Sequence, residues 1–403
     1  MNIELSDIER ASERLRGIVH HTELDLSTTF SGMTGSRVYL KCENRQKTGS
    51  FKIRGASNKI AAMVERCEKC PVVASSAGNH AQGVAYAATR FHIPATIVMP
   101  KSAPIAKVQA TEGYGAKVVL AGDCYDDAYA KACEICEKEG AVFLHPYNDP
   151  EVIAGQGTLG LEILGDLPNV DIVICPAGGG GLLAGLASAI KQINPRVKVY
   201  GVQAEGADAI ARSYREKKLV TTDTVSTIAD GIAVKAPGDI TVELINRYAD
   251  GVVTVSDSEI AEAILLLMER CKQIVEPAGA TPLAAVLNNK LDIKGRRVVC
   301  LMSGGNIDVS FIQGIIERGL VARHRRLKFT VALLDKPGSL VQMLEILAAA
   351  GANILTVEHD KLNAEIKPNE TTVHVACEVG GKEHGSLVLE KLKTAGYLVQ
   401  LDF

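Results

Sequence analysis

The sequence has no tryptophan, and aromatic residues make up only 4% of its 403 residues. Its 44 lysine and arginine residues nearly balance its 47 aspartate and glutamate residues. Because nucleic-acid binding uses a basic surface and aromatic stacking, we expect no nucleic-acid partner. No apolar run reaches the roughly 20 residues of a membrane helix, and the acidic N-terminus does not fit a secretion signal. We therefore expect a cytoplasmic protein with no membrane partner.

Ten cysteines are spread along the chain, and many lie inside apolar, strand-like stretches. This pattern is typical of reduced, buried thiols rather than of a disulfide framework. Two Cys-x-x-Cys pairs, Cys67 with Cys70 and Cys133 with Cys136, could nominally supply four zinc ligands. The second pair falls inside a predicted helix and lacks the turn that zinc sites use, so we predict no metal site.

Short β-rich stretches alternate with helical patterns from residue 38 to about residue 320. This alternation predicts an α/β fold with open, mostly parallel sheets. Nine strands are too many for one comfortable sheet, so we expect two lobes. The predicted strands are RVYLKCE, PVVASS, ATIVMP, KVVLAG, AVFLHP, VDIVICPA, VKVYGVQ, GVVTVS and RRVVCLMS.

A short basic stretch, VARHRRLK, begins where this alternation stops. Such a run of charge is typical of a solvated linker, which we place at residues 321–326. Residues 327–403 then follow the order strand, helix, strand, strand, helix, strand. This βαββαβ order predicts a separate ferredoxin-like domain.

Lys52 lies in the segment KTGSFKIRGASNKI. A lysine that acts as Schiff-base nucleophile and base must be held and desolvated so that its amine can lose its proton, and aromatic, glycine and serine neighbours suit that task. A lysine in a basic loop is more often simply solvated. This segment alone therefore leaves both interpretations open.

Four consecutive glycines, residues 178–181, stand between a buried strand and a helix. Glycines at such a turn allow successive backbone N–H groups and the positive end of the helix dipole to face one phosphate. The spacing fits neither a dinucleotide-binding fingerprint nor a nucleotide P-loop. A glycine turn that serves only tight packing is the alternative.

Two further polar loops follow predicted strands: SSAGNH at residues 75–80 and SGGN at residues 303–306. Hydroxyls, backbone amides and an asparagine at a helix start suit a carboxylate or a phenolate oxygen. Because open α/β sheets bind ligands at the carboxyl ends of their strands, these loops and the glycine run predict one shared cleft.

The segments SFKIRGA, SAGNHAQG, GGGG and SGGN, in this order, resemble the pyridoxal-phosphate enzymes of the tryptophan-synthase-β type, fold type II, and specifically the threonine dehydratases, also called threonine ammonia-lyases. The resemblance covers about residues 5–320. It implies a catalytic region at residues 1–320 whose small lobe, about residues 45–145, is inserted in the large lobe. It also implies pyridoxal 5′-phosphate as the cofactor.

The resemblance implies a role for each matching residue. Lys52 would form the Schiff base with the cofactor and act as the catalytic base, and Phe51 would pack against the pyridine ring. Asn79 would hydrogen-bond the phenolate oxygen, and Ser303 would face the pyridine nitrogen. The other implied cofactor contacts are Gly178, Gly179, Gly180 and Gly181 at the phosphate, and Gly231 and Glu276 along the cleft.

The implied reaction is the elimination of water from L-threonine, which yields 2-oxobutanoate and ammonia, and also from L-serine, which yields pyruvate. Ser75, Ser76 and Asn79 would bind the substrate.

Serine racemase and β-replacement synthases share the fold and stay as alternatives. The racemase has a second serine at the position of Ala77, which has no proton to give. Its metal site is incomplete here, because Ala211 replaces an acidic residue six positions after Glu205.

Residues 327–403 resemble an ACT domain, a regulatory module that usually binds amino acids between two copies. The segments DKPGSL and GANI carry this resemblance, which implies ligand contacts at Gly338 and Asn353. An amino-acid or nucleotide effector and a homodimer or homotetramer are the partners it implies. A dimerisation module without a ligand, and a non-catalytic amino-acid sensor, are the alternatives.

Overall fold

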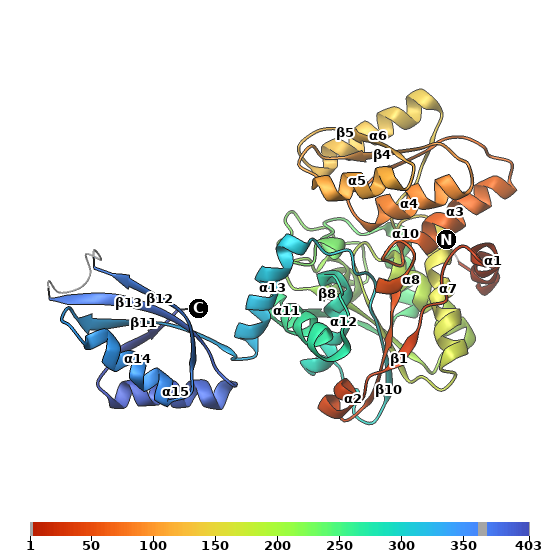
Figure 1. The fold of residues 1–403 in the computed structure, drawn as a ribbon. Helices are drawn as coiled ribbons and strands as arrows, with labels where there is room; N and C mark the ends of the chain where they lie inside the picture. Colours follow the sequence, from red (N-terminus) through yellow and green to blue (C-terminus); the bar gives the residue numbers. More distant parts are fainter. Residues whose placement is uncertain (1–2, 362–368, 403) are drawn as a thin grey trace. The chain divides into compact units, whose positions relative to one another are not determined.

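The computed structural model describes residues 3–361 and 369–402 and divides into two compact units, Met1–Asp308 and Val309–Phe403 (Figure 1). Helix α13 (Val309–Ala322) belongs to the second unit, so this division precedes the boundary expected at residue 320. Two local features connect α13 with the second unit. Strand β11 (Arg326–Leu334) follows α13 almost at once, and the Arg326 guanidinium donates to the Glu317 carboxylate at 2.6 and 3.0 Å.

The large lobe of the first unit has a six-stranded sheet in the order β1-β2-β10-β7-β8-β9. Neighbouring strands are parallel except for β1 with β2. Strand β7 is buried at every residue, as a strand covered on both faces requires. The bounds are β1 (Leu24–Leu26), β2 (Arg37–Lys41), β7 (Ile172–Pro176), β8 (Lys198–Ala204), β9 (Gly251–Val255) and β10 (Arg297–Leu301).

Helices cover this sheet. Their bounds are α1 (Leu5–Leu15), α2 (Thr28–Thr34), α7 (Pro150–Asp166), α8 (Gly181–Ile193), α9 (Ala209–Glu216), α10 (Asp239–Tyr248), α11 (Asp257–Leu266) and α12 (Pro277–Leu287), with short helical turns η1 (Glu43–Arg45), η2 (Asp230–Ile232) and η3 (Leu267–Cys271). Residues of α1, α7, α8 and α10 share one hydrophobic core with the sheet, and α12 contacts β7, β8 and β9.

The small lobe has a four-stranded, fully parallel sheet in the order β5-β4-β3-β6. Its bounds are β3 (Val72–Ser75), β4 (Ala95–Met99), β5 (Lys117–Leu120), β6 (Val142–Phe143), α3 (Lys52–Glu65), α4 (Asn79–Arg90), α5 (Ile105–Gly113) and α6 (Tyr125–Glu139). One face packs on α3 and α4, which lie toward the large lobe in Figure 1, and alternate strand residues pack on α6. All nine predicted strands are therefore confirmed, while the three-residue β1 was not predicted.

The second unit has an antiparallel sheet in the order β12-β13-β11-β14, with a hydrophobic core shared by the sheet and helices α14 and α15. Its further bounds are α14 (Ser339–Ala349), β12 (Asn353–Asp360), β13 (Glu370–Glu378), α15 (Lys382–Thr394) and β14 (Val399–Leu401). The chain order after α13 is the predicted βαββαβ, so the ferredoxin-like, ACT-like fold is confirmed. Within the described residues, no helix is both long and apolar enough to span a bilayer.

Candidate active site

Lys52 is the first residue of α3, and its side chain is partly buried. Its ammonium group donates to the Pro146 carbonyl at 3.0 Å and lies 5.3 Å from the centroid of the Phe51 ring. Burial disfavours the cation and lowers the pKa of Lys52 to about 8, although the charge of Glu276 acts in the opposite direction. A much larger share of this amine is therefore unprotonated near neutral pH than for a solvated lysine.

The loop that leads into Lys52 is joined to the loop after β10. The Phe51 N–H donates to the Ser303 carbonyl at 3.0 Å, and the Gly305 N–H donates to the Gly49 carbonyl at 2.9 Å. Ser50 and Gly304 form an isolated antiparallel bridge between these two bonds. The predicted residues Phe51 and Ser303, which are far apart in sequence, thus lie side by side.

Asn79 and Glu276, which are far apart in sequence, contact one another. The Asn79 side-chain amide donates to both oxygens of the Glu276 carboxyl group, at 2.9 Å each. Burial raises the pKa of Glu276 to about 7, while this hydrogen bond acts to lower it. Gly304 and Gly231 border the carboxyl group: a Cβ atom added to them would lie 2.5 and 3.6 Å from its Oε1 atom. At Gly304 only a glycine allows this approach.

The four glycines form the turn into α8. Gly180 has a φ of +96°, which favours glycine, and α8 begins without a side-chain cap. A Cβ atom added to Gly179 would lie 2.4 Å from the ring of Tyr147, and one added to Gly181 would lie 2.9 Å from the Tyr147 Cα atom. The turn is therefore closely covered by Tyr147, and its helix end suits an anion.

Tyr147 connects this turn with the lysine. It directly follows Pro146, whose carbonyl accepts the Lys52 hydrogen bond, and its hydroxyl donates to the Ala236 carbonyl at 2.8 Å. The Lys52 amine and the glycine turn are thus held by adjacent residues. Sequence reasoning missed Tyr147, and its place directly after the β6 region was the signal that could have identified it.

Ser75 and Ser76 lie at the carboxyl end of β3, just before α4. The Ser75 hydroxyl is buried and has no hydrogen-bond partner among the described residues. The Ser76 hydroxyl accepts from the Gly78 N–H at 3.2 Å, and α4 begins without a side-chain cap. This loop offers an unpaired hydroxyl and a helix N-terminus, two groups that suit a carboxylate.

These contacts bring most of the predicted catalytic, cofactor and substrate residues close together in the first unit. Gly338 and Asn353 belong to the second unit, where Gly338 precedes α14 with a φ of +92° and Asn353 opens β12. All ten cysteines are free thiols, and among residues 3–361 and 369–402 no three His, Cys, Asp or Glu side chains are grouped to hold a metal ion.

The model of a family described as pyridoxal-phosphate dependent enzymes matches residues 15–304, a range that contains Lys52, Asn79 and the glycine turn. The chain belongs to this family.

Three relatives illustrate the family. The chain is 50% identical to an L-threonine ammonia-lyase of Thermotoga maritima over 399 residues, 99% of each protein. It is 47% identical to the catabolic L-threonine dehydratase of Escherichia coli strain K12 over 315 residues, 78% of this chain and 96% of that protein. The structure of maize serine racemase is 36% identical with a TM-score of 0.75, and the match covers 80% of this chain and 100% of that one.

The cleft of this family member fits pyridoxal phosphate. The Lys52 amine is desolvated, and among the described residues no carboxylate forms an ion pair with it, so it is available for a covalent bond to an aldehyde. The glycine turn and the uncapped start of α8 suit the phosphate. Lys52 would hold the reactive end of the cofactor, and residues 178–181 would hold its phosphate.

The first prediction concerns the pH dependence of cofactor attachment. In protein freed of its cofactor, the attachment rate of Lys52 to added pyridoxal phosphate is expected to rise about tenfold per pH unit below about 8 and to level off above it, because only the unprotonated amine attacks. Stopped-flow absorbance measures this rate, with N-acetyl-lysine as a control that continues to accelerate toward its ordinary pKa. A profile identical to the control would contradict a desolvated Lys52.

A second prediction concerns the glycine turn. The Gly179→Ala variant is expected to bind pyridoxal phosphate more weakly, since an added Cβ atom 2.4 Å from the Tyr147 ring forces the turn that would hold the phosphate to shift. Gly165→Ala, in α7, is the matched control, because an added Cβ there meets no atom within 4 Å. Absorbance titration of cofactor-free protein gives both dissociation constants, and equal values would contradict the tight turn.

A cluster of charged side chains adjoins α3. The buried Arg54 guanidinium hydrogen-bonds both oxygens of Glu43 at 2.8 Å each, and it also donates to the Glu162 carboxylate at 2.6 and 3.1 Å. The buried Lys41 ammonium pairs with Glu162 at 2.8 Å and with Asp166 at 3.2 Å. Two cations that would be costly to bury alone are therefore neutralised by three carboxylates.

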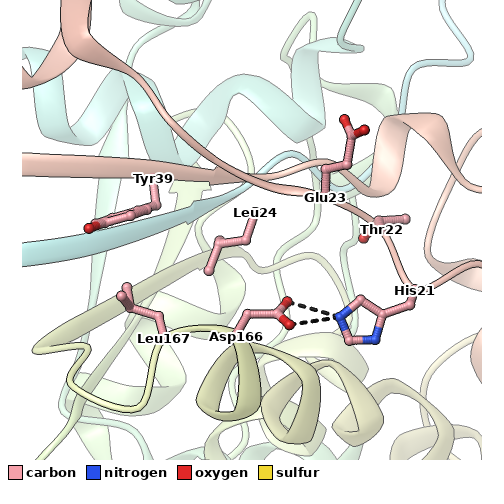
Figure 2. A pocket seen from close by; sticks show the side chains of 7 residues that line it. All are labelled: His21, Thr22, Glu23, Leu24, Tyr39, Asp166 and Leu167. Carbon is pink, nitrogen blue, oxygen red and sulfur yellow. Dashed lines mark hydrogen bonds and ion pairs between the residues drawn. The ribbon is translucent and has the colours of Figure 1, made fainter.

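Figure 2 shows the outer end of this cluster, where the Asp166 carboxylate and the His21 ring point toward one another and lie 2.8 Å apart. The two side chains line a pocket of about 350 Å³. None of the predicted active-site residues is among the residues that line this pocket. Its other lining residues are Thr22, Glu23, Leu24, Tyr39 and Leu167.

Proposed function

We propose that the chain is a pyridoxal-phosphate-dependent L-threonine ammonia-lyase, which eliminates water from L-threonine and releases 2-oxobutanoate and ammonia. L-Serine would be a second substrate and would yield pyruvate. The observation that carries the proposal is the similarity over the full length to the Thermotoga maritima L-threonine ammonia-lyase. The arrangement of Lys52, Asn79 and the glycine turn supports it.

The proposed chemistry assigns two tasks to Lys52. Lys52 would hold the cofactor, and its free amine would remove the proton from the substrate α-carbon. Bound pyridoxal phosphate would serve as the sink for the electron pair that this proton leaves behind. The depressed pKa of Lys52, about 8, suits a base that works near neutral pH.

The loop after β3 would bind the substrate carboxylate. The unpaired Ser75 hydroxyl, the Ser76 hydroxyl and the uncapped N-terminus of α4 supply the donors. Ala77 lies within this loop and has no proton to return to the α-carbon. Its methyl group favours elimination over racemisation, although the maize serine racemase shares the fold.

The test is an assay of the cofactor-loaded protein with L-threonine and L-serine, in which 2-oxo acid and ammonia are measured together with the chirality of the remaining serine. Release of 2-oxobutanoate with little D-serine supports the proposal. D-Serine as the main product would favour the racemase alternative, and a product formed only with an added thiol would favour β-replacement. Binding of the cofactor with no turnover of any of these substrates would favour the amino-acid sensor.

We also propose a regulatory role for residues 327–403, with residues 321–326 as the linker and residues 1–320 as the catalytic region. The ACT-like sheet supports it, and Gly338 and Asn353 would contact an amino-acid or nucleotide effector. Titration of the lyase rate with isoleucine, valine and nucleotides tests the proposal. Unchanged rates and unchanged oligomeric state with all of these compounds would contradict it.

A further inference from the structure

We propose that Asn306 is a positioning residue that fixes which end of the Asn79 side-chain amide faces the cofactor. The Asn306 side-chain amide donates to the Asn79 Oδ1 atom and to the Thr48 carbonyl, both at 2.8 Å, with the Gln82 Oε1 atom at 3.5 Å. Asn79 then directs its own NH₂ group toward Glu276 and the cleft. The inference rests on the proposed cofactor contact of Asn79 but not on the identity of the amino-acid substrate.

A backbone acceptor fixes the orientation of the Asn306 side-chain amide. The Thr48 acceptor is a backbone carbonyl, which can only accept hydrogen bonds, so the NH₂ group of Asn306 must face it. The same NH₂ group then meets the Oδ1 atom of Asn79. If the Asn79 amide were flipped, two NH₂ groups would face each other and its oxygen would face the Glu276 carboxyl group.

Glu276 cannot fix this orientation by itself. A carboxyl group accepts hydrogen bonds when it is ionised and can also donate one when it is protonated. The pKa of Glu276, raised to about 7 by burial, makes both forms accessible near neutral pH. The Asn306 amide has no comparable change of state, so it keeps Asn79 in one orientation whatever the charge of Glu276.

The loop that carries Lys52 leaves room for Asn306. A Cβ atom added to Gly49 would lie 2.3 Å from the Asn306 Oδ1 atom, and Gly49 has a φ of +73°. Asn306 therefore contacts both the loop that leads to Lys52 and the side chain that would bind the phenolate oxygen. A donor suits that anionic oxygen, whereas a flipped Asn79 would present an acceptor to it.

The Asn306→Asp variant tests this inference, because it keeps the shape of the side chain and replaces the donor with an acceptor. We expect Asn79 to flip and the bound cofactor to lose a donor at its phenolate oxygen. The absorbance of the bound cofactor should then shift from the long-wavelength band, in which that oxygen is deprotonated, to the short-wavelength band. Pyridoxal phosphate should bind about tenfold more weakly, the value of one lost hydrogen bond.

A double-mutant cycle with Asn79→Ala separates positioning from a general structural effect. In the Asn79→Ala background, Asn306→Asp should cause no further change in the absorbance bands. A shift of the same size in that background, or an unchanged spectrum in the single variant, would overturn the inference. If Asn306→Asp fails to fold, as judged by circular dichroism, Asn306→Ala carries the same test with a smaller expected shift in the same direction.

Discussion

The Lys52→Ala variant is expected to release 2-oxo acid from L-threonine at least about 10⁴-fold more slowly than the wild-type protein. Proton transfer by a positioned base alone contributes about 10²- to 10⁴-fold, and the variant also loses the covalent hold on the cofactor. In the wild-type protein, burial and the Lys52 charge lower the pKa values of His80 and His145 to about 3 and 4, so neither imidazole is a strong base. The decisive measurement is the single-turnover rate with saturating cofactor.

Two further variants make this result specific. Lys52→Arg keeps the positive charge, but a guanidinium stays protonated at any working pH, so the same loss of rate is expected. Lys47→Ala removes an amine that lies in the same loop and donates to the exposed Gly17 carbonyl, at 3.4 Å. It should retain nearly full activity. Borohydride reduction followed by peptide mapping should label Lys52 in the wild-type protein, and labelling of another lysine would refute its assigned role.

The fold was predictable because its signals are local. Each β-rich run, such as residues 172–176, is separated from the next by a helical pattern, and parallel sheets buried on both faces require such runs. The strand that sequence reasoning missed, β1 at Leu24–Leu26, has only three residues and pairs antiparallel at the edge of the sheet. So short a segment has no detectable period.

The residues of the candidate site also differ in how far local sequence signals could identify them. The four glycines stand out locally, because they directly precede a helix. Lys52 was assigned from the resemblance carried by four motifs in order, since its own segment left both interpretations open. Asn306 and Tyr147 do not stand out locally, since their roles depend on partners that only the tertiary fold brings near. Asn306 contacts Thr48, which is 258 positions away in the chain, and Tyr147 covers the turn at Gly179. The position of each residue after a predicted strand places it near the expected site, but no pattern within either segment specifies those contacts.

The charged cluster beside α3 could not be foreseen from sequence either. Buried arginine and lysine side chains are rare unless they are paired, and nothing local marks Arg54 or Lys41 as buried. Yet Arg54 lies two residues after Lys52, in the first turn of α3, and its carboxylate partners come from η1 and α7. The cluster thus anchors the helix that begins with Lys52 to two other elements of the first unit.

The Glu43→Ala variant is expected to lower the free energy of unfolding by about 3–5 kcal/mol, because it leaves the buried Arg54 guanidinium with only part of its compensating charge. Glu134→Ala, which removes an exposed partner of Lys131, is the matched control and should leave the free energy of unfolding nearly unchanged. Urea unfolding monitored by circular dichroism compares the three proteins. Equal losses for the two variants would show that the Arg54 pair contributes no more than a surface pair.

The Glu43–Arg54 ion pair also predicts how the difference in the free energy of unfolding between wild type and Glu43→Ala depends on pH. Burial alone would raise the pKa of Glu43, but the adjacent Arg54 guanidinium, aided by Thr22 and Lys41, holds it below its usual value. A carboxyl group whose pKa is lower in the folded state contributes its full stability above its unfolded pKa of about 4.3 and loses it as the pH falls through the folded value. The gap between wild type and Glu43→Ala should therefore be constant from about pH 6 to 8 and shrink in acid. A gap that widens in acid would mean that Glu43 is protonated in the folded protein.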